Sequence, residues 1–162
     1  MNMSNWYDFL DVVGDIISHE DVQSMVHIPH HLDVSCYEHS VFVAYTAFVS
    51  ARRLGLDSSA VARAGLLHDL YLYSREDRRA LPGWHFIIHP REALKNARAM
   101  TELTKKEQNI ILSHMWPLPG RMPRSREAVI VNLADKYCAL MEAAGIWHSL
   151  RMRLLVNSEQ IA

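Results

Sequence analysis

Residues 64–73 read AGLLHDLYLY, an apolar run that is interrupted only by His68 and Asp69. The apolar side chains on both sides predict that this pair is buried. A carboxylate that is removed from water is costly unless it is paired, hydrogen-bonded or bound to a metal ion. Two interpretations follow: a core histidine that is hydrogen-bonded to its neighbour, or the first two ligands of a metal site.

The segment before this stretch predicts a central helix. Ser35 and Glu38 have the spacing of a capping box, in which each side chain satisfies a free backbone amide of the first helical turn. The residues that follow are apolar on most sides until Gly55, which is typical of a helix end. His39 lies in the second turn of this helix, so we expect its side chain in the interior.

A second predicted helix leads directly into the His68–Asp69 pair. Asp57 can cap its beginning, and its alanines and Gly65 permit a close approach of a neighbouring helix. After the pair, we expect residues 74–83 to form a charged loop. Three basic residues of this loop are candidates for contact with phosphate, with solvated surface as the alternative: Arg75, Arg78 and Arg79.

A proline follows the next histidine, in IIHPREALKNA. The residue before a proline avoids the helical region, whereas proline suits the first position of a helix. The sequence therefore predicts a helix over 90–100 with His89 at its mouth. We expect His85, four residues earlier, not to share one continuous helix with His89, and we keep His85 as a reserve ligand.

Two more helices carry polar residues among apolar ones. Thr104 and Glu107 form a second capping box, and the helix that they begin has His114 near its end. A long helix over 125–145, ended by Gly145, has Asp135 within its apolar face, followed by Lys136. We place its largest apolar residues in the core: Val129, Ile130, Leu133, Leu140 and Met141.

Amphipathic helices flank this central part. The first residues repeat Trp6, Phe9 and Val13 at helical spacing. At the other end, Trp147, Leu150, Leu154 and Leu155 suit either a homodimer surface or packing on the bundle. The sequence has no strand pattern and no hairpin dipeptide. It therefore predicts an all-α fold with one domain over 1–162, whose core spans 35–144.

Between the first two helices lies an irregular connection with three histidines. Pro29 interrupts this segment, and His27, His30 and His31 surround it. One of them could support a metal ligand or contact a substrate. For each one taken singly, a polar loop residue is the simpler interpretation.

The composition excludes several classes of protein. The chain has 162 residues with 49% hydrophobic and 22% charged residues, as in ordinary globular domains. Its net charge of -1 argues against nucleic acid or an acidic membrane as partner. No apolar run is long enough to span a bilayer, and no basic region precedes the first apolar residues. The two cysteines, Cys36 and Cys138, indicate a reduced, cytoplasmic setting.

Six residues with metal-ligand side chains fall at positions where core residues are expected. Sites in helical bundles are built from such side chains on facing helices. Imidazoles with carboxylates suit Mn, Fe, Co, Ni or Zn. One or two divalent ions are therefore expected, although a core of buried histidines without metal is the alternative. The six residues are His39, His68, Asp69, His89, His114 and Asp135.

In this order on an all-α chain, these residues resemble the HD-domain superfamily of metal-dependent phosphohydrolases. The segments HSVFVAY, LLHDLYLY and IVNLADKYCALME are especially similar to small bacterial HD-domain proteins. The resemblance implies that His39, His68, Asp69 and Asp135 hold a first metal ion, with Asp69 bridging to a second at His89 and His114. It also implies that Asp69, His68 and Lys136 act in catalysis, Lys136 by contacting phosphate unless it is a solvated helix lysine.

The implied reaction is hydrolysis of a phosphomonoester or phosphodiester, such as a nucleotide, by metal-activated water. Two departures keep the substrate open: Leu70-Tyr71-Leu72 replaces the Ile-Gly-Lys of many relatives, and the Gly-Tyr-Pro signature of cyclic-dinucleotide phosphodiesterases is absent. Two alternatives remain, a regulatory module that binds nucleotide or metal without turnover, and a di-iron oxygenase. Metal identity, oxygen dependence and turnover of phosphate esters would separate them.

Overall fold

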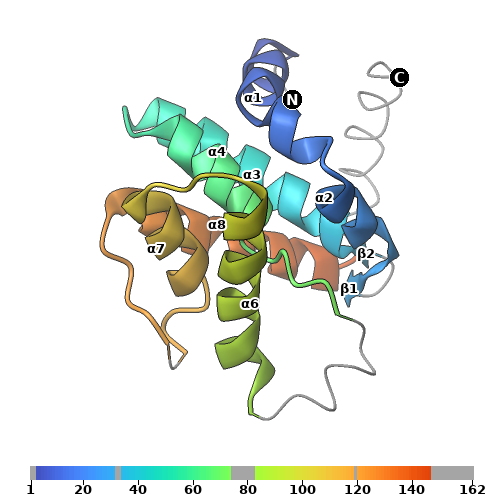
Figure 1. Ribbon diagram of the computed structural model, residues 1–162. Coiled ribbons are helices and arrows are strands. Elements are labelled where there is room, and N and C mark those ends of the chain that lie inside the picture. The colour runs from blue at the N-terminus through green and yellow to red at the C-terminus, as the bar shows by residue number, and fades with distance from the viewer. Residues whose placement is uncertain (1–2, 32–33, 74–82, 119, 147–162) are drawn as a thin grey trace.

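The computed structural model describes residues 3–31, 34–73, 83–118 and 120–146, which form a bundle of helices (Figure 1). The predicted all-α class is confirmed. Each described helix is too short or too polar to cross a lipid bilayer. Helices α3 (Cys36–Arg53) and α4 (Ser58–Leu67) form the centre of the bundle, and α7 (Lys105–Ser113) and α8 (Arg126–Ala143) pack around them. Three helices lie outside these four: α1 (Met3–Ile17), the short α2 (Glu20–Ser24) and α6 (His85–Met100).

Helices α3 and α4 pack together at the centre of the bundle. The Ser35–Glu38 capping box begins α3 as predicted, and Gly55, with a φ of 63°, follows its end. Asp57 caps α4 by accepting the amide of Ala60 at 3.0 Å. A Cβ added to Gly65 would lie 3.0 Å from the Cα of Ala44. A larger residue would press on the backbone of Ala44, so Gly65 suits the close approach of α3 and α4 at this point.

Helix α1 covers one end of α3 and α4 with aromatic side chains. Trp6 and Phe9 are buried, and the Trp6 ring lies 5.3 Å from that of Tyr45 in α3. Phe9 contacts Phe48 edge-on at 5.7 Å. The four residues Trp6, Phe9, Tyr45 and Phe48 are called the aromatic cluster below.

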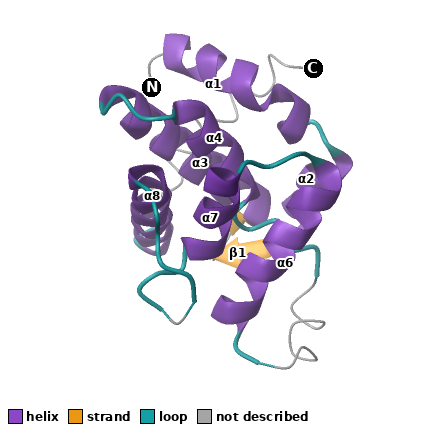
Figure 2. Ribbon diagram, turned by 60° about the vertical axis from the view of Figure 1, so that its left-hand side comes forward, coloured by secondary structure: helices purple, strands orange, loops and turns teal. Residues whose placement is uncertain are grey.

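A short antiparallel ribbon corrects the expectation that the chain forms no strand. Strands β1 (Pro29–His31) and β2 (Val34–Ser35) pair in the connection that leads to α3, and Figure 2 shows β1 among the helices. Strands of three and two residues are too short to show the alternation of apolar and polar side chains by which a strand is predicted. Its pairing satisfies backbone groups of a connection that crosses the bundle.

Helix α6 begins at His85 and contains Pro90, so the prediction that helix 90–100 begins at Pro90 is wrong. His85 and His89 share this helix, and their rings lie 4.6 Å apart. Pro90 sits in the second turn, where its missing N–H leaves the Phe86 carbonyl without its helical partner. The packing of both histidines toward the bundle outweighs this loss.

The predicted core face of α8 is also wrong for three of its five residues. Val129, Leu133 and Leu140 are 43%, 59% and 70% exposed. Small side chains face α3 and α4 instead: Ala128, Val131, Ala134 and Cys138. The pattern is ambiguous because α8 is apolar nearly all round, and close helix packing favours the smaller side chains. The predicted C-terminal helix with Trp147, and the loop arginines Arg75, Arg78 and Arg79, lie outside the described residues.

Candidate metal centre

The structure brings the six residues with metal-ligand side chains to one place inside the bundle. His89 Nε2 and His114 Nε2 lie 3.3 Å and 3.5 Å from Asp69 Oδ1. On the other side, His39 Nε2 and His68 Nε2 lie 3.2 Å and 3.9 Å from Asp135 Oδ1. The groups that could hold a metal ion include His39–His68–Asp69, His68–His114–Asp135 and Asp69–His89–His114.

Five helices position these side chains, two of them by their C-terminal ends. His68 and His114 each follow the last residue of a helix, α4 and α7. In each case Nδ1 contacts the carbonyl oxygen three residues earlier, at 2.7 Å for Gly65 and 2.8 Å for Ile111. A helix end has free carbonyls, so the same local geometry orients both imidazoles.

The histidines share one orientation, with Nδ1 on an acceptor and Nε2 toward the centre. His89 Nδ1 contacts the His85 carbonyl oxygen at 2.9 Å, and His39 Nδ1 contacts Glu142 Oε1 at 2.8 Å. A carbonyl or carboxylate oxygen only accepts, so Nδ1 carries the proton in each ring. In the neutral form of each ring, Nε2 then presents its lone pair, and this is the form of histidine that binds metal.

This arrangement is suited to a cation. His68 Nε2 and Asp69 Oδ1 are buried without a hydrogen-bond partner, and His89 Nε2 lies 2.7 Å from His114 Nε2. Two lone pairs at this distance repel each other unless a proton or a metal ion lies between them. The donor set of imidazole nitrogens and carboxylate oxygens fits a divalent transition metal.

Glu142 belongs to the centre and was not predicted from the sequence. Its side chain is buried, 1% exposed, and holds His39 from the side opposite Asp135. A carboxylate on the far nitrogen of a metal-binding histidine fixes the ring and increases its basicity. Asp135 and Glu142 are two helical turns apart on α8, and this spacing is the signal that could have found it.

The surroundings of the histidines shift their pKa values in opposite directions, upward for His39 and downward for His114. Although burial disfavours the charged form, hydrogen bonds with Asp135 and Glu142 raise the pKa of His39 to about 10. Burial, together with His68 and His89, lowers the pKa of His114 to about 3. Burial also opposes ionisation of Asp69, but His68 and His89 hold its pKa well below the usual range. The side chain of Asp69 is therefore an ionised carboxylate.

Comparison with known protein families identifies the architecture. The HD domain family matches residues 36–140, which is more than half of the chain and includes all six residues. The chain belongs to the HD-domain family. Searches of curated proteins and of solved structures found no match. Membership in this family suggests metal-dependent hydrolase activity, and the buried His/Asp groups of this HD domain could hold the metal.

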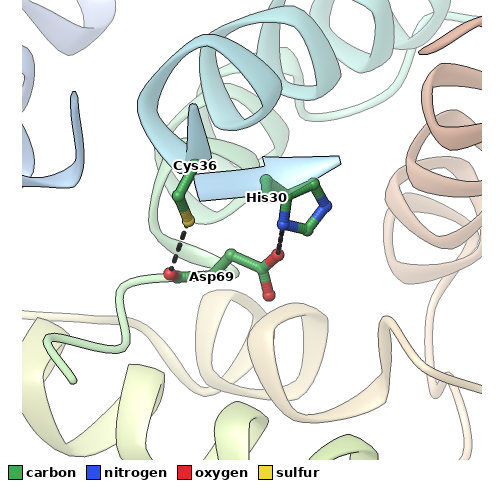
Figure 3. A group of neighbouring side chains, drawn as sticks. All are labelled: His30, Cys36 and Asp69. Carbon is green, nitrogen blue, oxygen red and sulfur yellow. Dashed lines mark hydrogen bonds and ion pairs between the residues drawn. The ribbon is translucent and has the colours of Figure 1, made fainter. Parts of the chain in front are cut away.

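Of the three histidines around Pro29, the structure brings His30 into the centre (Figure 3). Its Nδ1 lies 3.9 Å from Asp69 Oδ2, and its ring lies 4.0 Å from that of His39. The Cys36 thiol donates to the backbone oxygen of Asp69 at 3.4 Å, and burial raises its pKa. The raised pKa favours the neutral thiol, and the ligand atoms of His30, Cys36 and Asp69 lie close enough together to hold a metal ion. His27 is exposed, and the side chain of His31 lies outside the described residues.

A cavity of about 390 Å³ opens beside the centre of this HD domain. Asp69, His89, His114 and Asp135 form part of its wall, and His30, His85 and Lys136 add polar groups around them. The Lys136 ammonium donates to the His114 carbonyl oxygen at 3.2 Å, and burial lowers its pKa. Lys136 is thus half-buried in the cavity wall and is not a fully solvated helix lysine.

Proposed function

We propose that this HD domain holds one or two divalent transition-metal ions and hydrolyses a phosphomonoester or phosphodiester, such as a nucleotide. The single observation that carries the proposal is the common orientation of four buried histidines, each with Nε2 toward Asp69 or Asp135. Such ions, when bound, lower the pKa of a water and stabilise negative charge on phosphoryl oxygens.

Asp69 is the residue best placed to bridge two ions. Its Oδ1 lies near His89 and His114, while its Oδ2 lies 3.6 Å from His68 Nε2. A carboxylate with its two oxygens toward two sets of imidazoles can serve both sets. We therefore assign His39, His68, Asp69 and Asp135 to one ion, and His89 and His114 to a second that shares Asp69.

The cavity supplies the groups that would receive the substrate. Lys136 and His30 lie on its wall beside the carboxylates, where positive charge would offset the charge of a phosphate group. Tyr71, Met115 and Leu118 provide an apolar surface for the rest of the molecule. A volume of about 390 Å³ suits a small organic phosphate and is in the usual range of ligand sites.

Metal analysis followed by a substrate screen tests the proposal. Freshly purified protein is expected to contain Mn, Fe, Co, Ni or Zn, and to hydrolyse members of a panel of phosphomonoesters and phosphodiesters with that metal. Metal without turnover would favour a regulatory module, and oxygen-dependent activity of an iron-loaded protein would favour an oxygenase. Protein that neither contains nor binds any of these metals would overturn the proposal.

The number of ions has its own test. Replacement of both His89 and His114 by alanine should reduce bound metal from two ions to one while the helical circular dichroism is retained. His19 is the matched control, because it lies outside the centre and caps α2. If the wild type never binds more than one ion, the second site is wrong and the mononuclear assignment stands.

A homodimer in a cytoplasmic setting remains part of the proposal. The exposed apolar residues of α8 give it some support, because Val129, Leu133, Tyr137 and Leu140 follow one another along the helix at helical spacing. Sedimentation of the wild type and of a Leu133→Gln, Leu140→Gln variant would test this. The variant should be monomeric where the wild type is dimeric, and identical monomeric profiles would exclude the dimer.

A further inference from the structure

A second cavity lies next to the metal centre, between α6, α7 and the connection that leads to α8. Its volume is about 590 Å³, which is large enough for a small-molecule ligand. Met115 and Leu118 line this cavity and also the cavity of the metal centre. The two cavities therefore adjoin at these two residues.

Cationic side chains surround the second cavity. Arg91, Lys95 and Arg98 follow one face of α6, and Arg121 approaches from the connection between α7 and α8. All four are exposed, and none of the described residues that line the cavity is acidic. Glu92 lies 3.3 Å from Lys95 but does not line the cavity. Since the whole chain has a net charge of -1, this is a local concentration of positive charge that attracts anions.

The remaining lining is apolar and aromatic. Phe86 and Leu94 come from α6, and Trp116, which is 44% exposed, follows α7. A guanidinium group matches the geometry of phosphate oxygens, and an indole offers a flat face on which a nucleobase stacks. The cavity thus combines groups for several phosphates with a surface for a planar base.

We propose that this cavity binds a small nucleotide with two or more phosphate groups, at a site separate from the metal centre. Four cations exceed what one phosphate group needs, and the net charge of the chain argues against a nucleic-acid strand. Because Met115 and Leu118 line both cavities, the nucleotide lies beside the metal centre. It acts there either as a separate effector or as the distal part of a polyphosphorylated substrate.

Calorimetric titration of the metal-loaded protein with ATP tests the site, with magnesium in excess so that ATP does not remove the bound metal. We expect ATP to bind and adenosine to bind far more weakly. The Arg91→Gln, Arg121→Gln variant should raise the Kd for ATP by about tenfold or more, because charge-assisted hydrogen bonds to phosphate are strong. The matched control is Arg53→Gln, Lys105→Gln, which removes two exposed cations elsewhere and should leave the Kd within about twofold.

The Asp69→Asn variant separates this proposal from the proposed function. ATP binding that survives in Asp69→Asn and weakens in Arg91→Gln, Arg121→Gln supports the second cavity, whether or not the protein hydrolyses phosphate esters. ATP binding that is lost in Asp69→Asn and unchanged in the arginine variant would place the anion at the metal centre and overturn the proposal. Equal Kd values for the arginine variant and its control would also overturn it.

Two further measurements show whether the nucleotide is an effector or a substrate. If ATP alters the kcat or KM of a monophosphate ester without being consumed, the nucleotide is an effector. If ATP is itself hydrolysed and the arginine variant raises its KM alone, the cavity holds the distal phosphates of the substrate. Tighter binding of a single-stranded oligonucleotide than of ATP through the same arginines would overturn the small-nucleotide assignment in favour of nucleic acid.

Discussion

Helix α3 contributes to two buried clusters of rings that are stabilised in opposite ways. Its second half supplies Tyr45 and Phe48 to the aromatic cluster, whereas its first half supplies His39 to the metal centre. Burial of the aromatic rings is favourable in itself, while burial of imidazoles and carboxylates is costly unless their charges are balanced. The aromatic cluster therefore stabilises the fold without a ligand, whereas we expect the metal centre to gain stability from a bound cation.

The largest expected effect comes from the carboxylate at the middle of the metal centre. Asp69→Asn keeps the volume and one oxygen but removes the charge that would hold two cations together. It should abolish hydrolysis of the phosphate ester found by the screen. It should also remove most of the metal-dependent gain in stability, which for the wild type is roughly 2.7 kcal/mol at a hundredfold excess over Kd.

Thermal melts with and without chelator measure this effect, with the exposed Asp11→Asn as control. The metal-dependent increase in Tm should be present in the wild type and in the control and nearly absent in Asp69→Asn. A variant that loses equal stability in both conditions and retains full activity would instead make Asp69 a structural residue.

A substitution in the aromatic cluster should reduce the stability of the fold without reducing metal binding. Phe9 is fully buried and contacts Trp6, Tyr45 and Phe48. Phe9→Ala leaves a cavity and should lower the free energy of unfolding by about 3–5 kcal/mol, with the bound metal per folded protein unchanged. Tyr7→Ala on the exposed side of the same helix should change it by less than about 0.5 kcal/mol in urea denaturation. Loss of metal from folded Phe9→Ala would show that the two clusters are coupled.

Glu142 tests whether the second layer of the centre acts through His39. Glu142→Gln keeps the acceptor for His39 Nδ1 but removes its charge, so metal affinity should fall by roughly 10–100-fold. Glu107→Gln is the control, because Glu107 is also buried but pairs with Arg63. It should reduce stability without changing metal affinity. Competition with a chromogenic chelator gives both affinities, and equal losses would assign Glu142 a structural role alone.

The sequence predicts the metal-ligand residues of the centre better than it predicts the residues beside them. His39, His68 and Asp69 stand out because polar residues within apolar runs are costly, so the residue type itself is the signal. His30 carries no such signal, and although Glu142 interrupts the apolar run ALMEAA, this run alone does not show that its side chain faces the centre. The choice of His30 among three histidines depends on a two-strand ribbon without side-chain alternation, and Glu142 is recognisable only once Asp135 is placed on the inner face of α8.

The helix errors have a similar cause. A proline rule correctly describes the local preference at Pro90, but the packing of His85 and His89 toward the bundle overrides it. On α8, side-chain size does not reveal which face is buried, because close approach to α3 and α4 favours Ala134 over Leu133. Local rules thus predict where helices lie, and tertiary packing decides their first turns and their faces.

The smallest expected effect is at a charged cluster on the surface. Unlike the carboxylates of the metal centre, the charges of this cluster remain in contact with water. Lys106 lies 2.9 Å from Asp57 and 3.1 Å from Glu127, and Asp57 also caps α4. Asp57→Ala should lower the free energy of unfolding by about 1 kcal/mol through loss of the cap. Asp57→Asn retains a capping side chain and removes only a solvent-screened charge. This variant should therefore lower the free energy of unfolding by less than half of the amount expected for Asp57→Ala.

The pH dependence of this last effect has a definite sign. The backbone amide of Ala60 and then Lys106 lower the pKa of Asp57 below its ordinary value of 3.8. The folded state therefore favours the carboxylate, and its contribution is complete above the unfolded pKa and lost as the pH falls through the lower, folded pKa. Urea denaturation should separate the wild type from Asp57→Asn at neutral pH and bring their unfolding free energies together below about pH 4. A gap that widens on acidification would mean that Asp57 is stabilised in its protonated form, contrary to the contacts with Ala60 and Lys106.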